Sequence, residues 1–305
     1  MTPEMDLKGR RSVSLNAPRM PPTPEAPDLS PLVARMRWVL MAAIAGSAAL
    51  ALACQPAAFW SDPANAIRGD LLPVDNPLNH TFSFFLAHGP LPFVAANAVY
   101  AAGVFLLVSR LPAVLALAAI FGGVFAHGYG TTNWIANRFQ LGAGLSPALT
   151  GVWFGVLFLL ALQPTGIDLH RTIRGWRWLM IAVLVVDVIN TLAGQPPGYW
   201  LNPAVQREGN TWARFFLGYG WAAYVGYGLG IAAGELLLLE ILPTATACVF
   251  VLAATFGNFA GGSNWFFYEW RLGWLVPAAY AGLVGLLLVL TAPWGRRGRA
   301  AARGS

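Results

Sequence analysis

The stretch Gln55-Pro-Ala-Ala-Phe-Trp-Ser-Asp-Pro-Ala64 occurs a second time in this chain as Gln195-Pro-Pro-Gly-Tyr-Trp-Leu-Asn-Pro-Ala204, 140 positions later. Both copies follow the pattern Gln-Pro-x-x-aromatic-Trp-x-Asx-Pro-Ala, and each copy separates two long apolar runs. Arg37-Trp38 matches Arg177-Trp178 at the same offset. From residue 79 to residue 134 the second half follows the first at an offset of 131. The sequence therefore predicts an internal duplication.

The composition indicates a membrane protein. Hydrophobic residues make up 57% of the chain and charged residues only 10%, and the mean hydropathy is +0.57. About twenty apolar residues in a helix cross a hydrocarbon layer of about 30 Å, and a backbone in lipid must satisfy its own hydrogen bonds. We therefore expect helices over the eight apolar segments, which are residues 36–53, 92–109, 112–129, 146–163, 178–191, 221–239, 244–261 and 274–291.

The duplication divides these segments into two sets of four. An even number of helices gives both copies the same orientation, related by a pseudo-two-fold axis along the membrane normal. The expected fold is all-α and integral to the membrane, with eight transmembrane helices as two parallel four-helix repeats. The expected divisions are a disordered, proline-rich cytoplasmic tail (1–32), the first repeat (33–164), the second repeat (165–294) and a basic cytoplasmic tail (295–305).

The basic residues predict the orientation. Every basic residue except Lys8 is an arginine, and the arginines gather in one set of loops and in the two tails. Cytoplasmic loops carry such an excess, so both termini are expected in the cytoplasm, most simply of a bacterial inner (plasma) membrane, and the Gln-Pro motifs outside. This distribution explains the net charge of +6 without a nucleic-acid partner.

The duplicated outward segments are the first candidate site. They comprise Gln55, Trp60 and Asp62 with Asn133 and Trp134, and in the second half Gln195, Trp200 and Asn202 with Asn264 and Trp265. Two readings stay open. Tryptophans anchor proteins at the membrane interface, and amides cap helix ends. The same amides and indoles also suit a binding surface for neutral polar groups such as sugars or lipid headgroups.

The two halves differ at two ionisable positions. Asp62 corresponds to Asn202, and His127 corresponds to Asn258. A histidine near a carboxylate is an acid–base pair, so one half could be chemically active; alternatively His127 makes a structural hydrogen bond. The histidines lack the close spacing of metal ligands, so neither a metal nor another cofactor is expected.

Asp187 is the third candidate because it lies inside an apolar segment, with Asn190 one turn further along the same face. Glu235 follows a stripe of glycines at spacing four, Gly226, Gly230 and Gly234, which predicts close helix packing. Ionisable groups at membrane depth are costly and mark functional sites. Asp187 has either a structural role or a place on a substrate or proton path.

The leading functional hypothesis is binding or transport of a small polar or lipid-like ligand, recognised at the extracytoplasmic face between the two repeats. One alternative is a membrane-embedded enzyme acting on a lipid or lipid-linked sugar, with Asp62 and His127 as the acid–base pair. Another is a scaffold or assembly subunit that contacts a membrane protein partner. Apart from such a partner or ligand, the lipid bilayer is the one partner expected.

Overall fold

The computed structural model describes residues 28–54, 89–139, 141–194, 216, 218–270, 272–273 and 275–293. The described residues form α-helices joined by short turns, and they contain no strand. In chain order the helices are α1 (Ser30–Cys54), α3 (Pro90–Arg110), α4 (Ala113–Phe139), α5 (Gly142–Leu162), α6 (Leu169–Gly194), α9 (Trp221–Ile241), α10 (Thr244–Asn264) and α11 (Leu275–Thr291). A π-helical turn, Trp265–Glu269, continues α10.

Seven of these helices are long and apolar enough to cross a membrane. The remaining one, α11, is equally apolar and has 17 residues. An all-α chain with this many apolar helices has the architecture of a multi-pass membrane protein, which confirms the predicted fold class at this level.

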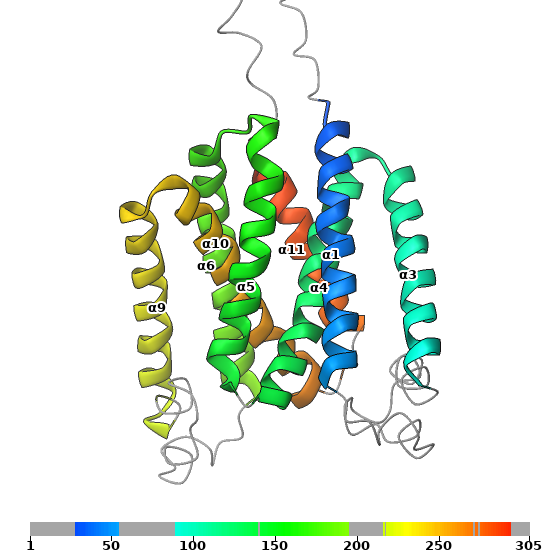
Figure 1. Ribbon diagram of the computed structural model, residues 1–305. Helices are drawn as coiled ribbons and strands as arrows, with labels where there is room; N and C mark the ends of the chain where they lie inside the picture. The colour runs from blue at the N-terminus through cyan, green and yellow to red at the C-terminus, as the bar shows by residue number, and fades with distance from the viewer. Residues whose placement is uncertain are drawn as a thin grey trace, which may run out of the picture.

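Figure 1 shows the arrangement of the helices. Six of them, α1, α4, α5, α6, α10 and α11, form a central bundle, and α3 and α9 stand at its two opposite sides. In the bundle α4 packs against α1 and α11, while α10 packs against α5 and α6. The outer helices have fewer partners, because α3 packs against α1 and α4, and α9 against α6 and α10.

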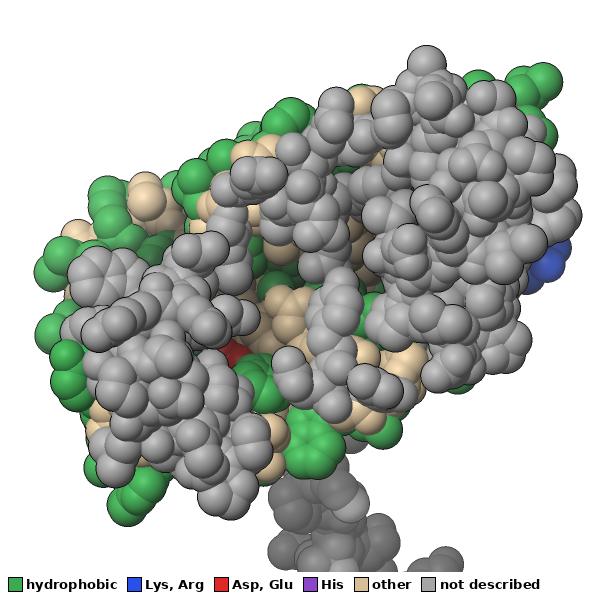
Figure 2. Space-filling view, turned by 90° about the horizontal axis from the view of Figure 1, so that it is seen from below, with side chains coloured by type: hydrophobic (Ala, Val, Ile, Leu, Met, Phe, Trp, Pro, Cys, Tyr) green, Lys and Arg blue, Asp and Glu red, His purple; other side chains and the backbone are tan. Residues whose placement is uncertain are grey.

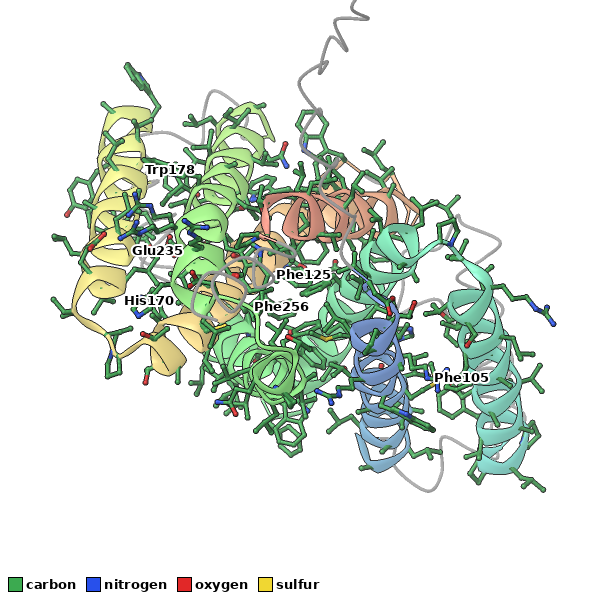
Figure 3. The ribbon with its side chains drawn as sticks, turned by 90° about the horizontal axis from the view of Figure 1, so that it is seen from above. Phe105, Phe125, His170, Trp178, Glu235 and Phe256 are labelled. Carbon is green, nitrogen blue, oxygen red and sulfur yellow. The ribbon has the colours of Figure 1, made fainter. Side chains whose placement is uncertain are left out.

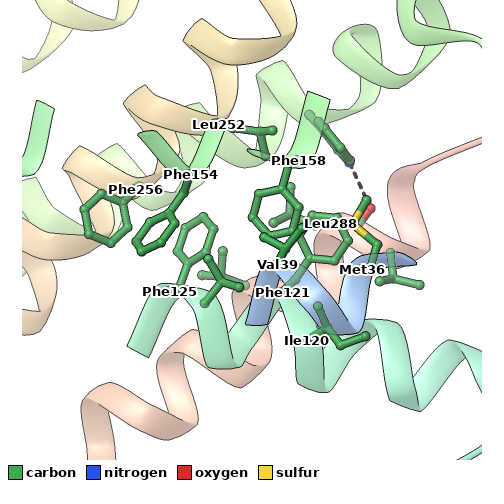
Figure 4. Close-up of a cluster of buried hydrophobic side chains, with 14 of the residues drawn as sticks. Met36, Val39, Ile120, Phe121, Phe125, Phe154, Phe158, Leu252, Phe256 and Leu288 are labelled. Carbon is green, nitrogen blue, oxygen red and sulfur yellow. Dashed lines mark hydrogen bonds between the residues drawn. The ribbon is translucent and has the colours of Figure 1, made fainter. Parts of the chain in front are cut away.

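The centre of the bundle is aromatic (Figure 4). Phe121 of α4 stacks on Phe158 of α5 with ring centroids 4.4 Å apart. Phe125 of α4 meets Phe256 and Phe259 of α10 edge-on, at 5.6 and 5.4 Å. Offset and edge-to-face pairs of this kind add to the packing energy of the rings, and here they join α4, α5 and α10.

Two glycine patterns of the same spacing have opposite environments. A Cβ atom on Gly151 would lie 2.8 Å from the carbonyl oxygen of Ala253, and one on Gly155 would lie 2.8 Å from that of Val249. This face of α5 therefore packs closely against α10. The expectation for Gly226, Gly230 and Gly234 is wrong within the described chain, because a Cβ atom on any of them would meet nothing within 4 Å. The reason is that α9 turns its other face, with the buried Tyr224 and Gly228, toward α6.

Several helices extend beyond the predicted spans. α1 begins at Ser30 rather than at residue 36, and α4 continues to Phe139 rather than ending at residue 129. α6 begins at Leu169, so the segment predicted as a loop with Arg171, Arg174 and Arg177 is helical. Asp168 explains this start, because its Oδ1 accepts the backbone N–H of Arg171 at 3.2 Å as an N-cap carboxylate does.

Candidate functional site

The structure describes five of the predicted site residues with their side chains, and they are His127, Asp187, Asn258, Asn264 and Trp265. Asn133 and Trp134 belong to α4, not to a segment after it, and their side chains are not among the described ones. The rest of the predicted site lies outside the described residues, namely Gln55, Trp60, Asp62, Gln195, Trp200 and Asn202.

Asp187 lies on α6, two turns before that helix ends at Gly194. Its carboxyl group occupies the space beside Gly261 of α10: a Cβ atom on Gly261 would lie 2.6 Å from Oδ2 and 2.8 Å from Oδ1 of Asp187. The glycine is thus what makes room for the carboxyl group between the two helices. Neither of the ion pairs among the described residues involves Asp187.

Polar groups from two further helices surround Asp187. Thr191 Oγ1 donates a hydrogen bond to the main-chain oxygen of Asp187 at 2.9 Å, and the buried Tyr224 hydroxyl of α9 donates to Thr191 Oγ1 at 3.1 Å. A Cβ atom on Gly262 of α10 would lie 3.5 Å from Cε1 of Tyr280, on α11, and 3.8 Å from Nδ2 of Asn190, on α6. Residues of four helices, α6, α9, α10 and α11, therefore lie in the region around Asp187.

Several polar atoms at this end of α6, α10 and α11 are buried and have no hydrogen-bond partner among the described residues. They are Asn190 Nδ2, Tyr280 Oη, Ser263 Oγ and Asn264 Oδ1. Buried polar atoms in proteins nearly always have a partner, and a group that lacks one calls for a water, an ion or a ligand. This cluster of unpaired donors and acceptors, together with Asp187, is referred to below as the polar cluster.

Aromatic rings form the apolar side of the same region. The Tyr280 ring lies between Phe259 and Phe266, with centroid distances of 5.0 and 5.5 Å. On α9 the ring of Tyr224, whose hydroxyl bonds to Thr191, has its centroid 6.1 Å from that of Tyr227. A carboxylate among tyrosine rings favours a ligand with N–H or O–H donors, and one with a positive charge most of all.

Figure 2 looks onto the end of the bundle where α6 and α10 finish. In the part of this face where described atoms are visible, the surface is hollowed and an acidic side chain is seen. Asp187 lies toward this end, because α6 ends here at Gly194. The polar cluster therefore lies toward the same end of the molecule.

Trp265 lies at the same end. A Cβ atom on Gly194, the last residue of α6, would be 2.6 Å from Cζ3 and 2.7 Å from Cε3 of the Trp265 indole. The ring therefore packs on the end of α6, directly before Gln195, which is outside the described residues. Trp265 borders the polar cluster, since Ser263 and Asn264 precede it in the chain.

His127 and Asn258 link the outer helices to the bundle. His127 Nε2 on α4 is 3.2 Å from the Tyr100 hydroxyl on α3, and Asn258 Nδ2 on α10 donates to Glu235 Oε1 on α9 at 3.3 Å. Figure 3 shows Glu235 on α9 from the end opposite to the hollow. These contacts have the form of structural hydrogen bonds between helices. The pairing of His127 with Asp62 stays a prediction, since Asp62 is outside the described residues.

Sequence reasoning missed Tyr224, Tyr280 and Gly261 as neighbours of Asp187. Each is unremarkable within its own apolar segment, and only the packing of four helices brings them together. A weak signal was present in Gly261-Gly262-Ser263-Asn264, where small and polar residues interrupt an apolar run. Comparisons of the chain with protein-family models, curated proteins and solved structures give no match.

Proposed function

We propose that this protein binds a small polar ligand at the polar cluster and carries it across the membrane. The observation that supports this most directly is Asp187, a carboxylate within an apolar helix that no described side chain pairs with. Charged groups inside membrane helices are expensive, and they pair with one another or serve a substrate or ion path. A ligand with N–H or O–H donors would supply the missing partner for Asp187 and for Asn264 Oδ1.

The proposal includes the duplication, with repeats at 33–164 and 165–294. Corresponding helices have corresponding partners: α1 packs on α4 as α6 packs on α10, and α4 packs on α11 as α5 packs on α10. Gly89 and Gly220, 131 positions apart, precede α3 and α9 with φ of 105° and 103°. A pseudo-two-fold relation between the halves accounts for these pairs, and transporters are commonly built in this way.

The proposed duplication relates the site of Asp187 to a neutral polar position in the first half. The position that corresponds to Asp187 is Ser47, whose Oγ lies 3.9 Å from a Cβ atom on Gly130, and Gly130 corresponds to Gly261. Each half thus has a polar side chain of its first helix beside a glycine of its third. Only the second half has a charge there, so the ligand is expected between α6, α9, α10 and α11.

The proposed orientation has both termini in the cytoplasm, in a bacterial inner membrane. The arginines at the described helix ends support it, because Arg35, Arg37, Arg110, Arg171 and Arg174 lie at the end where α1 starts and α11 finishes (Figure 1), against Arg138 at the other end. An excess of arginine marks the cytoplasmic side. The hollow in Figure 2 then faces the outside.

The test is native mass spectrometry of the protein extracted in a mild detergent, with Asp187→Asn compared with wild type and Glu235→Gln as the matched control. The wild type and Glu235→Gln are expected to retain a bound small molecule that Asp187→Asn has lost, while all three remain folded. Retention of the same molecule by Asp187→Asn, or a wild type without any small molecule, would contradict the proposal. The mass of the small molecule that the wild type retains then selects the compounds for uptake assays in proteoliposomes.

A second candidate function is that of an assembly subunit, and the open face of α9 favours it. Gly226, Gly230 and Gly234 leave a flat strip that no described residue covers, and small residues at this spacing let another helix approach closely. The same mass spectra distinguish the two functions. A stoichiometric protein partner in place of a small molecule would support the assembly role.

A further inference from the structure

Two arginines occupy matching positions in the two halves, at the end opposite to the hollow. Arg37 lies on α1 and Arg177 lies 140 positions later on α6. Each is followed by a tryptophan, Trp38 or Trp178, whose side chain is 60% or 59% exposed. The guanidinium carbon lies 6.0 Å from the Trp38 ring centroid in one half and 5.3 Å from the Trp178 centroid in the other. Exposed tryptophans at helix ends are typical of the membrane interface.

The partners of the two arginines differ. Arg177 Nη1 forms an ion pair with Glu240 Oε1 of α9 at 3.0 Å. The position that corresponds to Glu240 is Ser109 on α3, and its Oγ is 3.5 Å from Arg37 Nη1. The Ser109 hydroxyl already donates to the main-chain oxygen of Phe105 at 2.7 Å. One half therefore holds a carboxylate where the other half has a neutral side chain.

No carboxylate of the described residues balances the charge of Arg37. Arg35 lies two residues away on α1, and Arg110 follows Ser109 at the end of α3. The two ion pairs among the described residues, Arg171–Asp168 and Arg177–Glu240, include none of these three arginines. Among the described residues, Arg37 Nε is also buried without a hydrogen-bond partner, as is Arg177 Nε. Arg37 therefore lacks, within the described part of the chain, the carboxylate that Arg177 has.

The contact between α1 and α3 beside Arg37 is apolar. The Phe105 ring stands 4.6 Å from the Arg37 guanidinium carbon and 5.5 Å from the Trp38 ring centroid, and Figure 3 shows it between the two helices. The outward surface of α3 is also apolar, with Val99, Leu106 and Leu107 exposed. A cationic group at the interface above an apolar helix surface matches the two parts of a phospholipid.

We propose that Arg37 binds the phosphate of an anionic phospholipid whose acyl chains lie along the apolar surface of α3. Glu240 occupies the corresponding position in the second half and shows where the anion would lie relative to the arginine. Basic pockets at the cytoplasmic ends of membrane helices bind lipid headgroups in this way. The comparison of the halves rests on the proposed duplication, whereas the contacts of Arg37 do not depend on it.

The test exchanges the partners of the two arginines, Ser109 for Arg37 and Glu240 for Arg177. Ser109→Glu gives the first half the carboxylate of the second, and Glu240→Ser removes that carboxylate from the second half. Binding of dioleoylphosphatidylglycerol to the purified protein is measured by native mass spectrometry, with dioleoylphosphatidylcholine as the uncharged-headgroup control. Ser109→Glu is expected to weaken phosphatidylglycerol binding by about fivefold or more, the effect of about one interfacial charge. Glu240→Ser is expected to bind a second molecule.

Three controls complete the design. Ser109→Glu should keep its elution volume and melting temperature, because the corresponding ion pair already fits the fold between Arg177 and Glu240. Arg37→Gln should lose phosphatidylglycerol like Ser109→Glu, whereas Arg177→Gln should bind it like wild type. Equal binding by wild type and Ser109→Glu, or equal binding of phosphatidylcholine, would overturn the proposal. Displacement of the lipid by millimolar inorganic phosphate would assign the site to free phosphate instead.

Discussion

Asp187 and Gly261 fit together as a side chain and the space that accepts it: the Asp187 carboxyl group fills the position that a Cβ atom on Gly261 would take. The contact joins α6 to α10 near the hollow end of the molecule. The carboxyl group fits there only because residue 261 has no side chain. A substitution at either residue is therefore expected to disturb the other.

Gly261→Ala is therefore expected to displace the Asp187 carboxyl group, to lower the free energy of unfolding by about 1–3 kcal/mol through overpacking, and to lose the proposed ligand. Thermal unfolding in detergent and native mass spectrometry measure the two effects. The matched control is Gly257→Ala on the same helix, where a Cβ atom would meet nothing within 4 Å. Equal behaviour of the two variants would contradict the close fit.

The second prediction concerns the hydrogen bond that Tyr224 donates to Thr191. Tyr224→Phe removes a buried 3.1 Å hydrogen bond between α9 and α6 while keeping the ring. Hydrogen bonds between membrane helices contribute about 0.5–1.5 kcal/mol, so the free energy of unfolding in a titration with sodium dodecyl sulfate should fall by that amount.

Tyr227→Phe is the control for this experiment. The Tyr227 ring stacks on Phe216 at a centroid distance of 4.8 Å, and its hydroxyl has no hydrogen bond to the described residues. The control should unfold at the same detergent fraction as wild type. A loss of the same size in both variants would show that the tyrosine hydroxyls act through something other than the bond to Thr191.

The third prediction concerns the crossing of α4 and α11. A Cβ atom on Gly285 would fall on the backbone nitrogen of Gly122 and 2.5 Å from the carbonyl oxygen of Ala118. Because backbone atoms cannot turn aside, Gly285→Ala should separate the helices and destabilise the fold by about 1–3 kcal/mol or more.

Gly282→Ala, three residues earlier on α11, provides the comparison, since a Cβ atom there would meet nothing within 4 Å. It should melt at or above the temperature of wild type, because alanine favours a helix over glycine by about 1 kcal/mol. A Gly285→Ala protein as stable as Gly282→Ala would mean that the two helices lie further apart than described.

The sequence was sufficient to predict the all-helical membrane fold, because long apolar segments with few charges allow no other structure in lipid. It misplaced the start of α6, since Arg171, Arg174 and Arg177 lower the hydropathy without disfavouring a helix. Spacing alone also could not show which glycines are covered: Gly151 packs on α10, whereas Gly230 on α9 packs on nothing described.

Asp187 could be singled out from the sequence because a carboxylate in an apolar run is conspicuous. The residues that surround Asp187 could not be predicted from the sequence. Tyr224 belongs to α9 and Tyr280 to α11, and neither the spacing nor the composition of these helices indicates which face meets α6. Long-range packing decides that, and only the three-dimensional structure brings these side chains to one carboxyl group.

Trp176 carries the last prediction. Its side chain is 0% exposed, and its Nε1 donates a hydrogen bond of 2.8 Å to the main-chain oxygen of Leu288 on α11. Trp176→Phe loses this bond and leaves a void beside Phe121, whose ring centroid is 6.0 Å from the indole. We expect the free energy of unfolding to fall by about 1–3 kcal/mol, from the lost contacts and the lost hydrogen bond. Trp178→Phe, two residues along α6, changes an indole that is 59% exposed, so its unfolding should match that of wild type. If both variants unfolded alike, Trp176 would not be what holds α6 against α11. The packing of these two helices, the first and last of the second half, would then need another explanation.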